Sequence, residues 1–415
     1  MFKKIFQIVS ADTVFKAVSF LLIPFYLFWM PKVEYAEFTF LYTVFSTLPL
    51  LLSLSLYTPL MKFSSASELK EEKLKFYFST ANFVFLFCLI ILILFSLIGA
   101  QNFILENIFN VVNYIDIKWL LILLIVIFSS VNLVHFAHVV TFQNAQIVIK
   151  YNALKVLLLN LLSVIFLYSG FHDDTVILRL LGVACGELVL SFICFFWFGK
   201  GSWIFSIDIA YIKMALKFAA PLIPSGIVAM LIAASDRYFL SANYGNSYLA
   251  EYNLAIQFLV PISLIIIGAQ AAISPSIYSN KNAQDSLNKS ITYYFVLIVV
   301  FACASLLLAL TSYLGLEFGF IPSSYQNIVF LILILAFPVS MHALLGIVYN
   351  LFIRADKPMW VLCLSSFNAF LLIVGGSIFI PIYGYVGAAI NASIIYIVIS
   401  IIGYFMASSL SKNNI

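Results

Sequence analysis

The sequence predicts an all-α membrane protein with many spanning helices, and three observations lead to this fold class. Of its 415 residues, 64% are hydrophobic and only 9% are charged, whereas soluble domains carry about 25% charged residues. The mean hydropathy is +1.11. Long apolar runs recur along the whole chain, separated by short polar segments. Too little polar surface remains to enclose a large core, so the composition excludes a soluble protein.

Twelve segments are long and apolar enough to be transmembrane helices, which need about 20 mostly apolar residues each. The predicted spans cover residues 8–30, 36–61, 78–99, 118–141, 153–170, 176–198, 218–240, 249–275, 291–314, 325–349, 360–380 and 385–408. Because Asp12 and Lys16 interrupt the first apolar run and no small-residue cleavage site follows, we interpret this run as a retained span rather than a signal peptide.

The basic residues predict which side of the membrane each connection occupies. Of the 21 Lys and Arg residues, 16 fall in segments on the same side as the N-terminus, and two, Lys32 and Lys118, fall on the other side. The remaining three, Lys16, Arg179 and Arg237, lie within spans. Cytoplasmic connections carry the excess of Lys and Arg, so we expect both termini in the cytoplasm.

A weak internal repeat divides the twelve spans into two sets of six. The motif YAEF (Tyr35–Phe38) opens the second span and LAEY (Leu249–Tyr252) opens the eighth, and two prolines follow in each case. We therefore expect two six-helix lobes, at residues 1–199 and 218–415, joined by a basic cytoplasmic linker at 200–217. Such repeats place a substrate cavity between the halves and let the halves rock about it.

Ionisable side chains within spans are the first candidate functional residues, because each costs about 2.5–3.5 kcal/mol near the bilayer centre. Asp12 and Lys16 lie on one helical face of the first span, at i and i+4. Arg179 and Glu187 lie in the sixth. We expect these four to face a polar cleft. The alternatives are a structural ion pair near the cytoplasmic face for Asp12 and Lys16, and extension of Arg179 to the headgroups.

A second candidate group lies at the outer end of the seventh span. Asp236 and Arg237 follow the uncharged run FAAPLIPSGIVAMLIAAS, and Glu251 follows a short connection rich in turn residues. Neighbouring residues project about 100° apart on a helix, so we expect that Asp236 and Arg237 do not simply pair with each other. The sequence predicts that Asp236, Arg237 and Glu251 form a polar gate at the outer mouth of the cleft, with anchoring in the headgroup region as the alternative.

Catalytic, metal and cofactor motifs are absent from the sequence. It contains no Walker A loop, no GxSxG or HExxH motif, and no CxxC pair among its five Cys residues. His135, His138 and His342 fall in spans, where we interpret them as polar contacts between helices, with a proton relay as the alternative. We expect no enzyme activity, no cofactor and no metal, and the dispersed basic residues do not indicate nucleic-acid binding.

Three segments carry a resemblance to a known family. They are KFAAPLIPSGIVAMLIAASDRYFL (Lys217–Leu240), YGNSYLAEYNLA (Tyr244–Ala255) and YNLFIRADKP (Tyr349–Pro358). Together with the span count they resemble the Wzx-type polysaccharide flippases of the multidrug/oligosaccharidyl-lipid/polysaccharide (MOP) exporter superfamily. The resemblance implies a V-shaped pair of six-helix lobes that alternates between inward-open and outward-open states.

The resemblance also implies a cargo and a location. The cargo would be an undecaprenyl-diphosphate-linked oligosaccharide, such as an O-antigen repeat unit, turned from the cytoplasmic to the periplasmic leaflet of the bacterial inner membrane. Membrane lipids, H+ or Na+ as the coupling ion, and other polysaccharide assembly proteins would be its partners. The candidate cleft residues would include both acids and bases, whereas a very acidic glycan would favour a strongly cationic cleft.

Three other functions are considered. A cation-coupled multidrug exporter of the same superfamily is the first, because Asp12 is an acid in the first span. A lipid II flippase is the second, although twelve spans rather than fourteen disfavour it. A membrane-embedded polysaccharide polymerase or ligase would need a large outer loop, whereas the longest here, near residues 100–117, has about 18 residues and no His or Arg.

Overall fold

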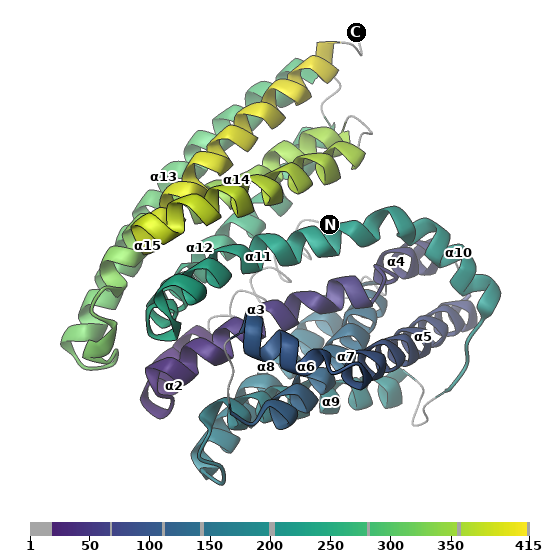
Figure 1. The fold of residues 1–415 in the computed structure, drawn as a ribbon. Helices are drawn as coiled ribbons and strands as arrows, with labels where there is room; N and C mark the ends of the chain where they lie inside the picture. Colours follow the sequence, from purple (N-terminus) through teal and green to yellow (C-terminus); the bar gives the residue numbers. More distant parts are fainter. Residues whose placement is uncertain are drawn as a thin grey trace. The chain divides into compact units, whose positions relative to one another are not determined.

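The computed structural model describes residues 19–66, 69–109, 113–141, 145–198, 204–279, 283–354 and 358–412, and these ranges are helical without any strand (Figure 1). The helices are α2 (Ile23–Trp29), α3 (Lys32–Leu52), α4 (Tyr57–Ala66), α5 (Lys70–Leu97), α6 (Ala100–Asn102), α7 (Ile115–Thr141), α8 (Ala145–Ser169), α9 (Thr175–Phe198), α10 (Ile209–Ala219), α11 (Ile223–Tyr244), α12 (Asn246–Ser279), α13 (Ala283–Glu317), α14 (Ile328–Arg354) and α15 (Pro358–Lys412). A π-helical turn covers Phe103–Ile108. Asp12 and Lys16 lie outside the described residues.

Within the described residues, nine helices are long and apolar enough to cross a membrane. They cover Lys32–Leu52, Glu71–Leu97, Ile115–Val140, Gln146–Ser169, Thr175–Phe198, Ile223–Tyr244, Val296–Glu317, Ser323–Phe352 and Met359–Ser409. The prediction of an all-helical, multi-pass membrane protein is therefore confirmed. Of the first predicted span, the described part is the shorter apolar helix Ser19–Trp29. The count of twelve spans and the cytoplasmic termini stay predictions.

The second predicted span, residues 36–61, is interrupted between α3 and α4. Leu54 and Ser55 in this connection have φ angles of 50° and 53°, in the left-handed region. Pro59 has no backbone N–H, so it cannot donate a helical hydrogen bond to the carbonyl of Ser55. The prediction of one continuous helix was wrong here. The sequence stays apolar through the turn between α3 and α4, so hydropathy does not reveal the break.

The last helix, α15, consists of two antiparallel arms that meet at Gly384. Its φ of 55° and ψ of −129° break the helix at that residue. Asn391 in the second arm donates a 3.0 Å hydrogen bond to the carbonyl of Leu372 in the first arm. A Cβ atom at Gly387 would lie 2.1 Å from the carbonyl oxygen of Phe379, so the arms pack backbone against backbone. This hairpin corresponds to the predicted spans 360–380 and 385–408.

The described residues divide into two compact units. The N-terminal unit includes the described residues up to Ala233, and the C-terminal unit includes those from Ala234 onward. The boundary falls inside α11. The expected lobes, 1–199 and 218–415 with a linker at 200–217, remain a prediction.

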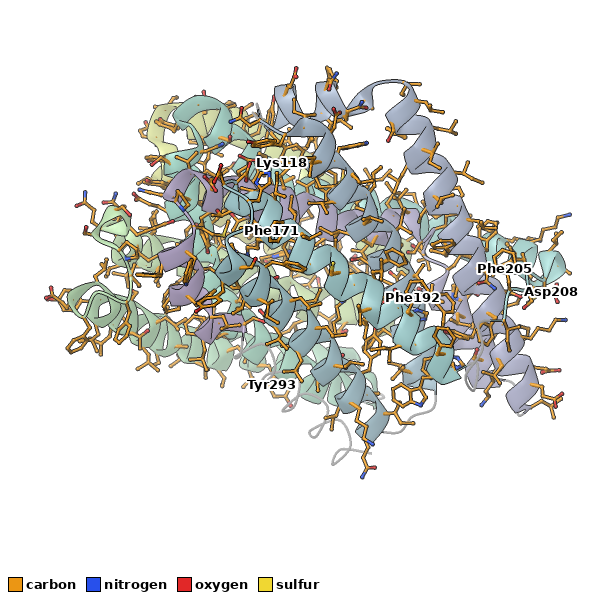
Figure 2. All side chains as sticks on the ribbon, turned by 90° about the horizontal axis from the view of Figure 1, so that it is seen from below. Lys118, Phe171, Phe192, Phe205, Asp208 and Tyr293 are labelled. Carbon is orange, nitrogen blue, oxygen red and sulfur yellow. The ribbon has the colours of Figure 1, made fainter. Side chains whose placement is uncertain are left out.

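Residues 204–219, which include most of the expected linker, are held against α5 in the N-terminal unit. Asn82 donates hydrogen bonds of 3.0 and 3.1 Å to the carbonyls of Ile204 and Ser206. Asp208 caps α10, because its side chain accepts a 3.0 Å hydrogen bond from the N–H of Tyr211. Figure 2 shows Asp208 at the edge of this unit. The segment is therefore an ordered part of the N-terminal unit.

Candidate functional site

Small residues on α9 bring it into close contact with α8 in the N-terminal unit. A Cβ atom at Gly182 would lie 2.4 Å from the Cα of Ser163, and one at Gly186 would lie 2.9 Å from the side chain of Leu159. Close approach of this kind is typical of helix pairs in membranes. As a result α9 places Glu187 in the interior of the unit, where it is only 3% exposed.

Glu187 is held by contacts from α7 and α8. Asn132 donates hydrogen bonds of 2.6 Å to the carboxylate and 3.0 Å to the backbone carbonyl of Glu187. Lys155 of α8 lies 3.6 Å from the other carboxylate oxygen, and its own side chain is 35% exposed. Ser191 donates to the Asn132 side-chain oxygen at 2.9 Å, and Tyr151 donates to the Asn132 carbonyl at 2.9 Å. The buried carboxylate of Glu187 thus has one partly exposed counter-ion, Lys155, and a hydrogen-bond donor, Asn132, that is itself held by Ser191 and Tyr151.

Arg179, two turns before Glu187, lies in a cage of aromatic side chains. Its guanidinium carbon is 3.8 Å from the ring centre of Tyr26, 3.9 Å from that of Phe38 and 5.7 Å from that of Tyr35. Its Nη1 atom lies 3.4 Å from the sulfur of Met30. Among the described residues no carboxylate forms an ion pair with Arg179, although the residue is only 8% exposed. Within this unit the Arg179 side chain therefore lies in the interior and does not reach the surface.

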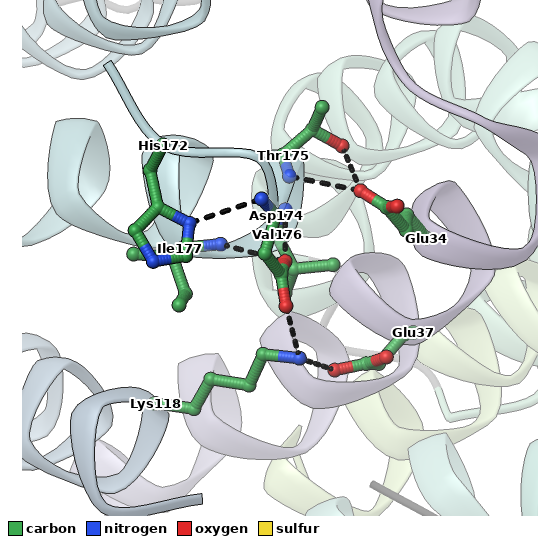
Figure 3. Close-up of polar contacts among 8 residues, drawn as sticks. All are labelled: Glu34, Glu37, Lys118, His172, Asp174, Thr175, Val176 and Ile177. Atoms are coloured by element: carbon green, nitrogen blue, oxygen red, sulfur yellow. Dashed lines mark hydrogen bonds and ion pairs between the residues drawn. The ribbon is translucent and has the colours of Figure 1, made fainter. Parts of the chain in front are cut away.

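A cluster at the end of the N-terminal unit where α7 and α9 begin was missed by the sequence analysis (Figure 3). The ammonium of Lys118 lies 2.6 Å from Glu37 and 2.8 Å from Asp174. Beside this ion triad, Glu34 accepts hydrogen bonds of 2.8 and 2.5 Å from the N–H and hydroxyl of Thr175. Lys118 had been assigned to an outer segment, yet its side chain is 2% exposed.

The sequence contained two signals for this cluster. Glu34 and Glu37 are three residues apart and so lie on one face of α3. Asp174 precedes the apolar run of α9 and accepts hydrogen bonds from the N–H groups of Val176 and Ile177, as a helix-capping residue does. Neither signal indicates that Lys118 would join them, because that contact depends on how α3 and α7 pack.

In the C-terminal unit, Asp236 and Arg237 do pair with each other, so the expectation that they would not was wrong. The Nη1 atom of Arg237 lies 3.4 Å from the nearer oxygen of Asp236. The backbone directions of neighbouring residues diverge, but the long arginine side chain bends back far enough to reach the carboxylate. From α12, Asn253 accepts a 2.9 Å hydrogen bond from Arg237, and Tyr252 donates to the other oxygen of Asp236. Sequence analysis did not select Tyr252.

Glu251, the third residue of the expected gate, makes its hydrogen bonds on a different side of α12. Its carboxylate accepts from Asn327 at 2.8 Å and from the hydroxyl of Tyr385 at 3.1 Å. The ring of Tyr385 stacks on that of Tyr248 with 3.3 Å between the ring centres. Glu251 is 5% exposed, and these contacts connect α12 to the turn before α14 and to the second arm of α15. A gating role for Asp236, Arg237 and Glu251 stays a prediction.

Of the three histidines predicted to lie in spans, His135 and His138 are buried, whereas His342 is exposed and its ring stacks on that of Tyr396. His135 receives or donates a 2.9 Å hydrogen bond with the hydroxyl of Tyr77, and the ring of His138 stacks on Tyr77 at 4.3 Å. His135 and His138 are fully buried. Among the described residues, no group of three or more His, Cys, Asp or Glu side chains is placed to hold a metal ion.

A comparison with protein-family profiles identifies the family to which the chain belongs. A family profile described as "Polysaccharide biosynthesis protein" matches residues 1–281, well over half of the sequence. The chain belongs to the polysaccharide biosynthesis protein family. No curated protein matches it in sequence. The resemblance to polysaccharide exporters is thereby confirmed at the level of the family.

Solved structures that resemble this polysaccharide biosynthesis protein belong to the MOP superfamily. An inward-facing multidrug resistance MATE transporter has a TM-score of 0.66 and 14% identity, covering 96% of this chain and 99% of its own. The lipid II flippase MurJ, in an inward closed conformation, has a TM-score of 0.68 and 15% identity, covering 98% of this chain and 86% of its own.

A MOP transporter from Pyrococcus furiosus has a TM-score of 0.64 and 14% identity, covering 98% of this chain and 96% of its own. At these identities the likeness concerns the fold alone. The family and the fold together make this protein a polysaccharide biosynthesis family member with the fold of MOP transporters.

Proposed function

We propose that the protein is a flippase that translocates undecaprenyl-diphosphate-linked oligosaccharide repeat units, of O-antigen or another surface polysaccharide. It turns them from the cytoplasmic to the periplasmic leaflet of the bacterial inner membrane by alternating access, and an H+ or Na+ gradient drives the cycle. The chain itself catalyses no reaction, and other polysaccharide assembly proteins supply and consume its cargo. Membership of the polysaccharide biosynthesis family and a fold shared with the lipid II flippase MurJ support this proposal.

The observation that carries the proposal is the environment of Arg179. An ionised side chain inside a bilayer costs about 2.5–3.5 kcal/mol, and stacking on an aromatic ring returns about 2 kcal/mol when the cation is desolvated. The rings of Tyr26 and Phe38 therefore offset much of the cost without neutralising the charge. Arginine has five N–H donors that match phosphate oxygens in pairs. We propose that the diphosphate of the cargo is the anion that Arg179 binds.

A cation-coupled multidrug exporter is the second candidate. The likeness to MATE transporters supports it, as do the buried carboxylate of Glu187 and the half-buried carboxylate of Asp236, because acids within a membrane attract cationic drugs and coupling ions. The two candidates differ in what Arg179 does. A diphosphate needs this cation, whereas a cationic drug is repelled by it.

Reconstitution tests the proposal directly. The purified protein, in vesicles containing a fluorescent undecaprenyl-diphosphate oligosaccharide, should make the inner-leaflet lipid accessible to a membrane-impermeant quencher. Arg179→Ala should abolish this flipping and Arg179→Lys should retain part of it, because a lysine keeps the charge but not the paired donors. Lys213→Ala, which removes an exposed cation from α10, is the matched control and should flip at the wild-type rate.

The same variants in cells separate the two candidate functions. Deletion of the gene should abolish surface polysaccharide and leave repeat units in the inner leaflet, and the Arg179→Ala gene should fail to restore it. Normal glycan in the deletion strain, together with altered drug sensitivity, would overturn the flippase proposal and favour the exporter.

A further inference from the structure

The outward face of α10 combines lysines with apolar side chains. At 3.6 residues per turn, Ile209, Lys213 and Lys217 follow one another along this face, and Met214 borders them. Both lysines are exposed, Ile209 is 66% exposed and Met214 is 47% exposed. The residues of the opposite face are buried in the N-terminal unit: Tyr211, Ile212, Ala215 and Ala219. The helix is therefore amphipathic, but the face that it turns away from the protein is not purely polar.

Contacts with α5 fix the depth at which α10 lies. The ring of Tyr211 stacks on that of Phe76 with 4.5 Å between the ring centres, and its hydroxyl accepts a 3.3 Å hydrogen bond from Thr80. Phe76 and Thr80 lie near the beginning of Glu71–Leu97, a segment long and apolar enough to cross a membrane. The basic-residue pattern predicts that this end of the segment is cytoplasmic. We therefore expect α10 to lie at the cytoplasmic boundary of the bilayer.

The chain on either side of α10 lies at a similar depth. Before it, the carbonyls of Ile204 and Ser206 accept hydrogen bonds from Asn82, which is further along the same apolar helix. Phe205 between them is 63% exposed, and Figure 2 shows it at the edge of the unit. After α10, only the turn Ala220–Leu222 precedes α11, which is itself long and apolar enough to cross a membrane. An exposed phenylalanine at this level is placed to meet lipid.

The lysines of α10 are not neutralised by neighbouring acids. Within the described ranges, neither Lys213 nor Lys217 forms an ion pair. Asp208 is the one acid in α10 and the segment before it, and it is paired with a lysine of α5 at 2.7 Å. Lys62 of α4 adds a third cation, 4.2 Å from the centre of the Phe218 ring. The surface therefore carries net positive charge where a bilayer presents its headgroups.

This combination of side chains fits an anionic lipid surface. An amphipathic helix lies in the interface when its apolar side chains enter the boundary of the acyl chains and its lysines stay among the headgroups. Lysine suits this position because its methylene stem can lie along apolar surface while the ammonium reaches outward. Each lysine near an anionic membrane surface strengthens binding by about fivefold. An acidic soluble protein would also attract the lysines, but it would have to displace lipid from Phe205.

We propose that anionic phospholipid headgroups of the cytoplasmic leaflet bind the outward face of α10. Lys213 and Lys217 hold the phosphates, with Lys62 beside them, while Ile209 and Met214 enter the edge of the acyl region. Because α10 is tied to α5 and leads directly into α11, the bound lipid fixes the segment between two spanning helices at the membrane surface. The inference concerns the lipid around the protein, so it does not depend on what the protein transports.

A photoreactive residue at position 209 identifies what covers this face. Benzoylphenylalanine in place of Ile209 should cross-link phosphatidylglycerol in clear excess in vesicles that contain equal amounts of phosphatidylglycerol and phosphatidylcholine with the same acyl chains. Mass spectrometry of the adducts is the measurement. Benzoylphenylalanine in place of Phe171, which is 60% exposed in the connection between α8 and α9 at the predicted outer end, should show no such excess.

Two results at position 209 contradict the proposal. Equal cross-linking of the two lipids would mean that the face meets the bilayer without selecting charge. In intact cells, an adduct with a protein and none with lipid would mean that a protein partner occupies the face.

Neutral variants test the role of the lysines. Lys213→Gln combined with Lys217→Gln should remove most of the phosphatidylglycerol excess at position 209. Salt at about 1 M, where the screening length is about 3 Å, should reduce the excess in the protein that keeps both lysines. Lys150→Gln removes an exposed lysine near the beginning of α8, on the same predicted side, and is the matched control that should keep the excess. An excess that survives in the double variant overturns recognition by these lysines.

Thermal unfolding gives a second measurement that needs no photoreactive residue. A ligand that binds the folded state raises the melting temperature, so phosphatidylglycerol added to the wild type in detergent should raise it more than phosphatidylcholine does. The double variant should lose this difference and Lys150→Gln should keep it. Equal stabilisation of the wild type by the two lipids overturns the proposal. Neither measurement uses flipping, so this inference and the flippase assignment can each fail while the other stands.

Discussion

The ammonium of Lys118 lies 2.6 Å from the carboxylate of Glu37, and the lysine side chain is only 2% exposed. This ion pair joins the beginning of α7 to α3, and Asp174 extends it to the beginning of α9. Three elements that are distant in the sequence thus meet at one buried cation. Removal of that cation would leave two carboxylates without their shared partner.

Lys118→Ala should lower the stability of the N-terminal unit. Breaking a buried ion pair by removing one partner typically costs about 3–5 kcal/mol, because the other charge remains buried. Thermal unfolding in detergent should show a clear fall in the melting temperature. Lys75→Ala, whose side chain is 61% exposed and paired with Asp208, should change the melting temperature far less. Equal shifts in the two variants would mean that Lys118 is solvated and not structurally required.

Acid should release α10 from α5. Hydrogen bonds to Asp208 from Lys75 and then from the N–H of Tyr211 lower the pKa of that carboxyl below its ordinary value. A carboxyl with a lowered pKa stabilises the folded state fully at neutral pH, and this contribution is lost as the pH falls below about 4. Hydrogen exchange in α10, corrected for intrinsic rates, should therefore increase in acid. Asp208→Asn should exchange faster at neutral pH and respond little to acid; a wild-type acid response in this variant rules the explanation out.

Gly387→Ala should destabilise the C-terminal unit by overpacking. The added Cβ atom would lie 2.1 Å from the carbonyl oxygen of Phe379, so the two arms of α15 would have to separate. Overpacking of a close contact costs about 1–3 kcal/mol. Gly245→Ala is the control, since its φ of 79° strains a side chain but the space around it is open; left-handed strain costs about 1–2 kcal/mol. A melting temperature that falls only in Gly245→Ala would show that the arms can move apart freely.

Arg237→Ala should impair export of the glycan. It removes both the ion pair with Asp236 and the hydrogen bond to Asn253, and it leaves a carboxylate without its cation. Surface polysaccharide in a complemented deletion strain, normalised to the amount of protein in the membrane, is the measurement. Tyr252→Phe removes only the hydroxyl that donates to Asp236, so it should have a smaller effect. Unchanged export in Arg237→Ala would identify the residue as an anchor.

Composition and hydropathy were sufficient to predict a helical, multi-pass membrane protein, because the cost of exposing backbone polar groups to lipid leaves few other structures. The break between α3 and α4 could not be predicted in the same way. The break occurs at Leu54 and Ser55, where the backbone adopts positive φ angles. Hydropathy carries no information about these angles.

The cost of placing charge in a membrane also selected the candidate residues, but it did not predict which side chains they contact. Arg179 and Glu187 were chosen because charge within a span is costly, but the aromatic cage and the amide of Asn132 come from other helices. Lys118 was overlooked because its position in the sequence resembles that of a loop residue. Contacts between helices depend on packing, and a single sequence does not contain that information.

The hairpin of α15 has a consequence for how the protein is made. Only Gly384 separates the two arms, and the amide of Asn391 in the second arm bonds to the Leu372 carbonyl of the first. If the first arm entered the lipid alone, the second would follow with an unsatisfied amide and no loop to delay it. We therefore expect the two arms to enter the membrane together, so that a substitution at Gly387 would impair insertion as well as the finished fold.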